Sequence, residues 1–116
     1  MKCIPFPNSA RDQLVRNCRE SKSAGKRLDH HPVVMLFTPD ADAAWLLSES
    51  DPDKQQFYGL CDLGFGAPEV GIVSLSELLE IEGPSGLPIE HDPAFTAIAP
   101  LSVYAAEARK AKRIVV

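Results

Sequence analysis

The chain has 116 residues, a formal net charge of −4 and 45% hydrophobic residues, which is typical of one soluble globular domain. This composition argues against wholesale disorder, collagen-like repeats and a disulfide scaffold. The longest apolar runs, Val33–Phe37 and Ala43–Leu47, are too short to span a bilayer. The N-terminal segment has no apolar stretch long enough for a secretory signal, so we expect a cytoplasmic protein that does not bind membranes.

The charges are distributed unevenly along the chain. Residues 1–27 carry seven basic and two acidic side chains. Residues 28–99 carry one basic and thirteen acidic side chains, and residues 100–116 carry four basic and one acidic. Two interpretations remain open for these basic ends around an acidic middle. The ends either fold back onto the acidic body or form a basic patch that meets phosphate or an acidic partner.

The first predicted element is a helix from about Ser9 to Glu20. Asn8 or Ser9 suits the N-cap position, because a short side-chain oxygen can accept a free backbone N–H. Leu14 and Cys18 share its apolar face. Residues 21–31 are polar, contain a glycine and predict a flexible link. We therefore expect residues 1–31 to form a basic helix with a linker, and residues 32–116 to form a single α+β domain.

Four strands are expected in the middle of the chain. They are Val33–Phe37, Ala43–Glu49 (with a helix as the competing prediction), Gln56–Leu63 and Val70–Val73. The strands are separated by turns that are rich in proline, aspartate and glycine. Short connections between successive strands favour an antiparallel meander over a parallel sheet.

Two further helices complete the prediction. Ser74 and Glu77 form a capping box that opens a short helix, which Gly83 and the following proline would end. A brief extended piece is expected near residue 89. The last helix starts at residue 100 or 102, and its apolar face consists of Leu101, Tyr104, Ala108 and Ala111.

The predicted fold class is thus α+β: a small antiparallel sheet packed with the capping-box helix and with one or both terminal helices. The predicted core contains eight large apolar side chains: Leu36, Trp45, Leu47, Phe57, Leu60, Val73, Leu78 and Phe95.

No motif predicts catalysis. The three cysteines, Cys3, Cys18 and Cys61, include no Cys-x-x-Cys pair, which favours free thiols. The three histidines, His30, His31 and His91, lack metal-ligand spacing, although whether they ever bind a metal stays open. The glycines around Phe65 are followed by an acid and a strand rather than by the helix that a phosphate loop needs. We expect no catalytic residue, no cofactor and no metal.

A series of short blocks, in this order along the chain, resembles one bacterial family. The blocks are residues 32–40, Trp45–Leu47, Gly59–Gly64, Pro68–Gly71, Ser74–Leu78, Gly86–Asp92 and Leu101–Arg109. Together they resemble domain of unknown function 2958, whose members are small proteins, often encoded on plasmids and integrated conjugative elements. The resemblance implies the same context here and no particular activity. This chain has Met35 where the family often has a basic residue, and His91 where it often has arginine.

Two functions follow as expectations. The first is an accessory protein of mobile genetic elements that binds a protein partner, with inhibition of host defence by DNA mimicry as a special case. Its candidate partner-binding residues lie in the acidic middle: Asp40, Asp42, Asp62, Glu69, Glu90 and Asp92. The second is weak nucleic-acid binding through the basic ends. Its candidate residues are Arg16, Arg19, Arg109, Lys110 and Arg113.

Overall fold

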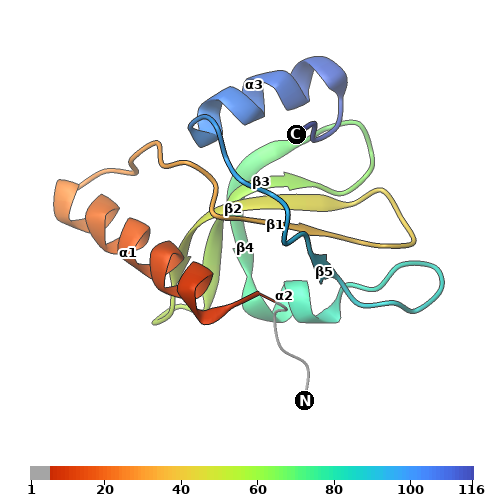
Figure 1. Ribbon diagram of the computed structural model, residues 1–116, viewed down its shortest axis with the longest axis horizontal. Coiled ribbons are helices and arrows are strands. Elements are labelled where there is room, and N and C mark those ends of the chain that lie inside the picture. Colours follow the sequence, from red (N-terminus) through yellow and green to blue (C-terminus); the bar gives the residue numbers. More distant parts are fainter. Residues whose placement is uncertain (1–5) are drawn as a thin grey trace.

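The computed structural model describes residues 6–116, in which three helices pack against a five-stranded antiparallel sheet (Figure 1). In chain order the elements are α1 (Asn8–Ala24), β1 (Val34–Phe37), β2 (Ala44–Asp51), β3 (Gln56–Asp62), β4 (Glu69–Ser74), α2 (Leu75–Glu80), β5 (Glu90–His91) and α3 (Leu101–Ala111). The strand order is β4-β3-β2-β1-β5. The first four strands form the predicted meander, and β5 adds to the free edge of β1.

Both faces of the sheet are buried. Val34 lies opposite Leu47, and Leu36 lies opposite Trp45, so these four side chains share one face. The alternate residue Leu46 points to the other face, where it joins a second apolar cluster. Burial on both faces explains why the start of β2 is a continuous apolar run without alternation. It also decides between the strand and helix predictions for that run in favour of the strand.

The helices divide between the two faces. Leu14 of α1 and Leu78 of α2 belong to the first cluster, whereas Leu101 and Tyr104 of α3 belong to the second. In Figure 1, α3 lies above the sheet, and α1 and α2 lie to its left and below it. Of the eight predicted core residues, seven are buried. Phe95 is only half-buried, and packs edge-on against Tyr104 with ring centroids 6.1 Å apart.

The N-terminal helix differs from its prediction at both ends. Its N-cap residue is Pro7, which has no capping side chain, so the prediction of Asn8 or Ser9 at that position is wrong. The helix continues through Ala24 and ends at Gly25, whose φ of 70° is the left-handed conformation that glycine adopts readily. Residues 21–24 are therefore helical, where we predicted a link. Ser21 lies in the final turn of α1 and is buried, and this burial favours the helix over a solvent-exposed link.

A β-bulge in β2 decides which way its last residues point. The register with β3 pairs Leu47 with Gly59 and then Glu49 with Tyr58, so Ser48 is the extra residue. The bulge moves Glu49 to the face of Tyr58, the face that α3 also covers. The side-chain amide of Asn17 in α1 donates to the Ser48 carbonyl at 3.0 Å and holds the bulge in place.

The C-terminal half follows the prediction with smaller differences. Ser74 Oγ accepts the backbone N–H of Glu77 at 3.1 Å, which confirms the cap of α2. That helix already ends at Glu80, before the predicted stop at Gly83. Ala111 is exposed, while Ala105 takes its place on the buried face of α3. No helix in residues 6–116 is long and apolar enough to cross a membrane.

Candidate functional site

Glu49 is a buried carboxylate at the centre of a polar cluster. Its side chain is 1% exposed. Ser21 Oγ donates to Glu49 Oε2 at 2.8 Å, and the Arg27 guanidinium donates to Oε1 at 2.8 Å. The Leu28 backbone N–H in turn donates to Ser21 Oγ. A buried charge needs such partners, because removing it from water is otherwise costly.

The same cluster orders the segment between α1 and β1. Arg27 lies over the Tyr58 ring, 4.0 Å from its centroid. His30 Nδ1 lies 3.4 Å from Glu49 Oε2, and His30 Nε2 lies 3.0 Å from Glu20 Oε2. Two residues of the predicted flexible link, Arg27 and His30, are therefore anchored to the strands and to α1. Glu49 is not among the site residues expected from the sequence, although a charge at the end of an apolar strand is a signal that points to it.

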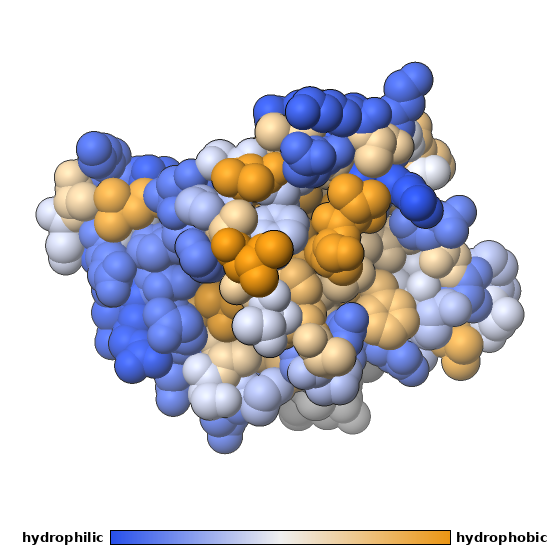
Figure 2. Space-filling view, turned by 45° about the horizontal axis from the view of Figure 1, so that its top comes forward, coloured by the Kyte–Doolittle hydropathy of each residue, from blue (hydrophilic) through white to orange (hydrophobic). Residues whose placement is uncertain are grey.

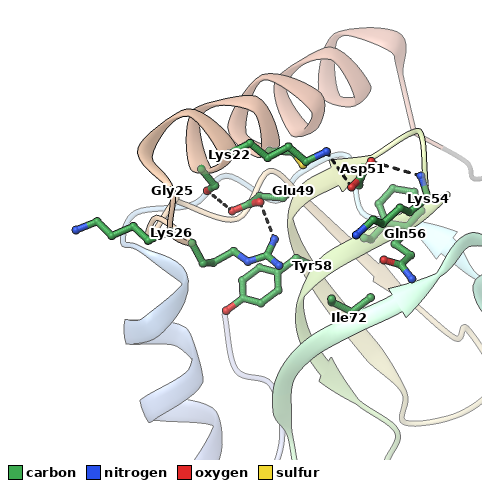
Figure 3. A pocket seen from close by; sticks show the side chains of 13 residues that line it. Lys22, Gly25, Lys26, Glu49, Asp51, Lys54, Gln56, Tyr58 and Ile72 are labelled. Atoms are coloured by element: carbon green, nitrogen blue, oxygen red, sulfur yellow. Dashed lines mark hydrogen bonds and ion pairs between the residues drawn. The ribbon is translucent and has the colours of Figure 1, made fainter.

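A cleft of about 340 Å³ opens beside this cluster, between the end of α1, the β2–β3 turn and strands β3 and β4 (Figure 3). Its floor includes Tyr58 and Ile72. We call it the basic cleft, because four cations and two acids line it: Lys22, Lys26, Arg27, Lys54, Glu49 and Asp51.

Both acids of the basic cleft have partners. Glu49 is held as described, and Lys22 Nζ lies 3.0 Å from Asp51 Oδ2. The hydrogen bond between these two raises the pKa of Lys22 and lowers the pKa of Asp51. Lys26 and Lys54 form no side-chain hydrogen bond or ion pair with any described residue. In Figure 3 the Lys54 side chain extends along the cleft, while Lys26 extends outward from its rim.

A second cleft, of about 240 Å³, adjoins the first and shares Arg27 and Tyr58 with it. Arg109 of α3 lines it and is exposed, with no side-chain partner among the described residues. Its one acid, Asp29, accepts hydrogen bonds from the backbone N–H and the hydroxyl of Ser102 at the start of α3. The two clefts meet at Arg27 and Tyr58 and together extend from the end of α1 to α3; we call the pair of clefts the groove.

The six acidic candidates have different surroundings. Asp62 is 2% exposed and accepts the backbone N–H groups of Gly64 and Ile114, so it anchors a loop and the C-terminal tail. Asp40 accepts the Ser85 N–H at 2.6 Å. Asp92 accepts the Ala94 N–H within its own turn. These three carboxylates therefore fix the backbone.

The other three acidic candidates, Asp42, Glu69 and Glu90, are exposed. Asp42 lies beside the β3–β4 loop, since a Cβ added to Gly64 would be 3.4 Å from its Cβ. Glu69 begins β4, opposite Cys61. Glu90 lies opposite Phe37 at the other edge of the sheet, three strand spacings or about 14 Å from Asp62. All three lie toward the same end of the sheet: Asp42 in the β1–β2 connection, Glu69 at the start of β4 and Glu90 on the edge strand β5.

This end of the sheet also exposes two large apolar side chains. Phe65 is 87% exposed and Leu63 is 57% exposed, both in the loop between β3 and β4. We call Leu63, Phe65, Asp42 and Glu69 the acidic loop end. Lys112 also lies near this loop, because a Cβ added to Gly66 would be 4.0 Å from the Lys112 Cβ.

The basic candidates do not form a continuous strip along α1 and α3. The two helices contribute to clusters on opposite faces of the sheet. Arg16 donates to Gln13 within α1, and Lys110 lies 3.6 Å from Glu107 within α3. Figure 2 shows hydrophilic atoms over the outer surfaces of both helices and apolar atoms gathered between them. Of the five candidates, only Arg109 lines the groove, while Arg16, Arg19, Lys110 and Arg113 lie outside it.

The two described cysteines, Cys18 and Cys61, are free thiols, and Cys3 lies outside the described residues. Burial raises the pKa of the Cys61 thiol to about 11 and also raises the pKa of Cys18. Among residues 6–116, no group of three or more His, Cys, Asp or Glu side chains could hold a metal ion.

Comparison with known families agrees with the sequence blocks. The family model described as Protein of unknown function (DUF2958) matches residues 6–115. The chain belongs to this family. No curated protein and no solved structure matches the chain. The DUF2958 match covers every element described above, from α1 to α3, so both the basic cleft and the acidic loop end lie within the family domain.

Proposed function

We propose that this DUF2958 protein is a non-enzymatic accessory protein that binds a protein partner through the acidic loop end. The observation that carries the proposal is Phe65, a large aromatic side chain that is 87% exposed in the β3–β4 loop, at the end of the sheet where Asp42 and Glu69 are also exposed. Aromatic side chains of this kind are frequent anchors of protein interfaces.

The loop that carries Phe65 is held in shape before any partner arrives. Asp62 Oδ1 accepts the Gly64 N–H at 2.9 Å, and Gly64 and Gly66 both adopt positive φ angles of 85° and 81°. A fixed loop loses little conformational entropy on binding, which favours affinity. Asp62 therefore supports the site by positioning the loop.

The chemistry of the partner follows from these groups. Phe65 and Leu63 need an apolar pocket, and Asp42 and Glu69 favour a basic rim around it. Attraction between opposite charges speeds the encounter and weakens as salt is added. A basic surface of a nucleic-acid-binding protein has this character. The plasmid and conjugative-element context implied by the family resemblance is part of the same proposal.

The test compares capture of a partner from a host lysate by immobilised wild-type and variant proteins. Phe65→Ala, and separately the pair Asp42→Lys with Glu69→Lys, should abolish capture at low salt. Ile98→Ala is the matched control, because Ile98 is an apolar side chain that is 89% exposed elsewhere. Equal capture by Phe65→Ala and wild type, or no captured protein at low salt, would contradict the proposal.

A further inference from the structure

We propose that the groove formed by the basic cleft and its neighbour binds single-stranded nucleic acid. This inference goes beyond the partner binding proposed above and uses a different surface. It depends on the described contacts of Arg27 and Tyr58 and on three cations, Lys26, Lys54 and Arg109, that have no partner among the described residues.

The charge of the groove is positive once internal pairs are taken into account. Arg27 neutralises Glu49 and Lys22 neutralises Asp51. Asp29 is hydrogen-bonded by the neutral Ser102 and keeps its charge, so three unpaired cations face one acid. Lys26, Lys54 and Arg109 are all exposed. They come from the end of α1, the β2–β3 turn and α3, so they are spread along the groove. A row of separated cations suits a chain of phosphates better than one phosphate.

The junction of the two clefts provides a surface on which a base can stack. The Arg27 guanidinium covers the Tyr58 ring at 4.0 Å, and its side chain keeps 40% exposure. A guanidinium is planar and stacks on rings on both sides, and its hydrogen bond to Glu49 fixes its orientation. Ile72, which is 57% exposed on β4, extends this surface. Single-strand binding proteins combine such stacking surfaces with basic grooves.

The size of the groove favours a single strand over a duplex. The two clefts of about 340 and 240 Å³, which meet at Arg27 and Tyr58, each admit small planar groups. A duplex keeps its bases stacked inside, where Arg27 and Ile72 could not reach them. The net charge of −4 opposes local binding only weakly at salt concentrations of about 0.1–0.15 M, because interactions between exposed charges are then screened beyond about 8–10 Å.

The test measures fluorescence anisotropy of a labelled oligodeoxythymidine of about 12 nucleotides, a length within the usual site sizes. We expect the wild-type protein to bind it at low salt. Three phosphate contacts give a salt slope of about −2, so raising salt from about 50 to 200 mM should weaken binding about 20-fold. A duplex of the same length and thymidine monophosphate should each bind at least about 10-fold more weakly.

Matched triple variants locate the site. Lys26→Gln, Lys54→Gln and Arg109→Gln together should reduce affinity at least about 10-fold, because they remove the phosphate contacts. Arg16→Gln, Arg19→Gln and Lys110→Gln remove the same charge outside the groove and should change affinity less than about 2-fold. All six side chains are exposed, so circular dichroism and thermal unfolding should match the wild type.

Several results would overturn the inference. One is the absence of oligonucleotide binding by the wild-type protein at low salt. Equal weakening by the two triple variants would show that only general charge matters. Binding of the duplex or of thymidine monophosphate as tightly as the oligonucleotide would exclude a single-strand site.

Discussion

Glu49 shows how one residue connects three parts of the fold. It lies on β2, and its partners Ser21 and Arg27 lie on α1 and on the segment after it. Each partner satisfies one carboxylate oxygen. The β-bulge at Ser48 turns Glu49 toward these partners and away from the apolar cluster that contains Leu47. A negative charge in that cluster would have no compensating contact.

Glu49→Gln should therefore destabilise the protein. The amide keeps an oxygen for one donor but loses the charge that Arg27 and Ser21 bind, and hydrogen bonds to charged groups contribute about 1.5–3 kcal/mol. We expect the free energy of unfolding, measured in urea, to fall by about 2 kcal/mol. Glu69→Gln, at an exposed position, should leave it unchanged. Equal stability of Glu49→Gln and wild type would contradict this role of the carboxylate.

The Cys61 thiol should react slowly in the folded protein. Its pKa is raised to about 11 by burial, so at pH 8 only about one thiol in a thousand is ionised, against about one in four at the ordinary value of 8.5. Alkylation of Cys61 at pH 8, followed by mass spectrometry of peptides, should be more than about 100-fold slower than in urea-unfolded protein. The rate should rise about 10-fold per pH unit up to pH 10. Equal rates in folded and unfolded protein would show that the thiol is accessible and has an ordinary pKa.

At the scale of elements, β2 and β3 pack backbone against backbone at the bulge. Gly59 lies opposite Leu47 on one side and Gly71 on the other. A Cβ at Gly59 would overlap the Leu46 carbonyl oxygen, whereas a Cβ at Gly71 would meet no atom within 4 Å. The need for glycine therefore differs between two residues that face each other in the same sheet.

Gly59→Ala and Gly71→Ala form a matched pair for this difference. Gly59→Ala should lower the free energy of unfolding by about 2–3 kcal/mol, because the main chain of β2 must shift. Gly71→Ala should be neutral or slightly stabilising, since alanine has less conformational freedom when unfolded. Chemical denaturation of the two variants measures the effect. Equal destabilisation by both would contradict the close approach of β2 to Gly59.

At the scale of the whole molecule, the meander separates the charges. The β1–β2 and β3–β4 connections lie at one end of an antiparallel sheet, and the β2–β3 turn lies at the other. Asp42 and Glu69 flank the first end. Lys54, the one basic residue between residues 28 and 99, lies in the β2–β3 turn beside Lys22 and Lys26. The acidic loop end and the basic cleft are therefore apart, although the net charge is small.

The two apolar clusters should unfold together because they share the strands of one sheet. Leu60→Ala removes a fully buried side chain from the cluster that α3 covers, and should cost about 2–4 kcal/mol. Trp45 fluorescence, which reports the opposite cluster, should show the same lower urea midpoint as far-ultraviolet circular dichroism. An unchanged Trp45 transition in Leu60→Ala would show that the two clusters unfold independently.

The sequence by itself determined the α+β class, the order of the elements and most of the core. Apolar runs such as Val34–Phe37, the turns between them and the cap at Ser74 are local signals, and local backbone preferences and burial act on them in the same direction. The length of α1 was underestimated, because the burial of Ser21 depends on a contact with Glu49, 28 residues away. The family followed from short blocks that lie in order along the chain.

Only the tertiary structure decided which charged residues share a surface. Periodicity predicts which face of its own element a side chain occupies, but not which residues of distant elements lie beside it. The bulge at Ser48 reverses the local alternation and creates the Glu49 cluster, and it depends on pairing with β3 and on Asn17. Asp62, one of the candidate partner-binding residues, accepts the backbone N–H groups of Gly64 and Ile114, and its burial depends on where the C-terminal tail returns. Long-range packing, which no local pattern encodes, brought Arg27, Lys54 and Arg109 to one groove.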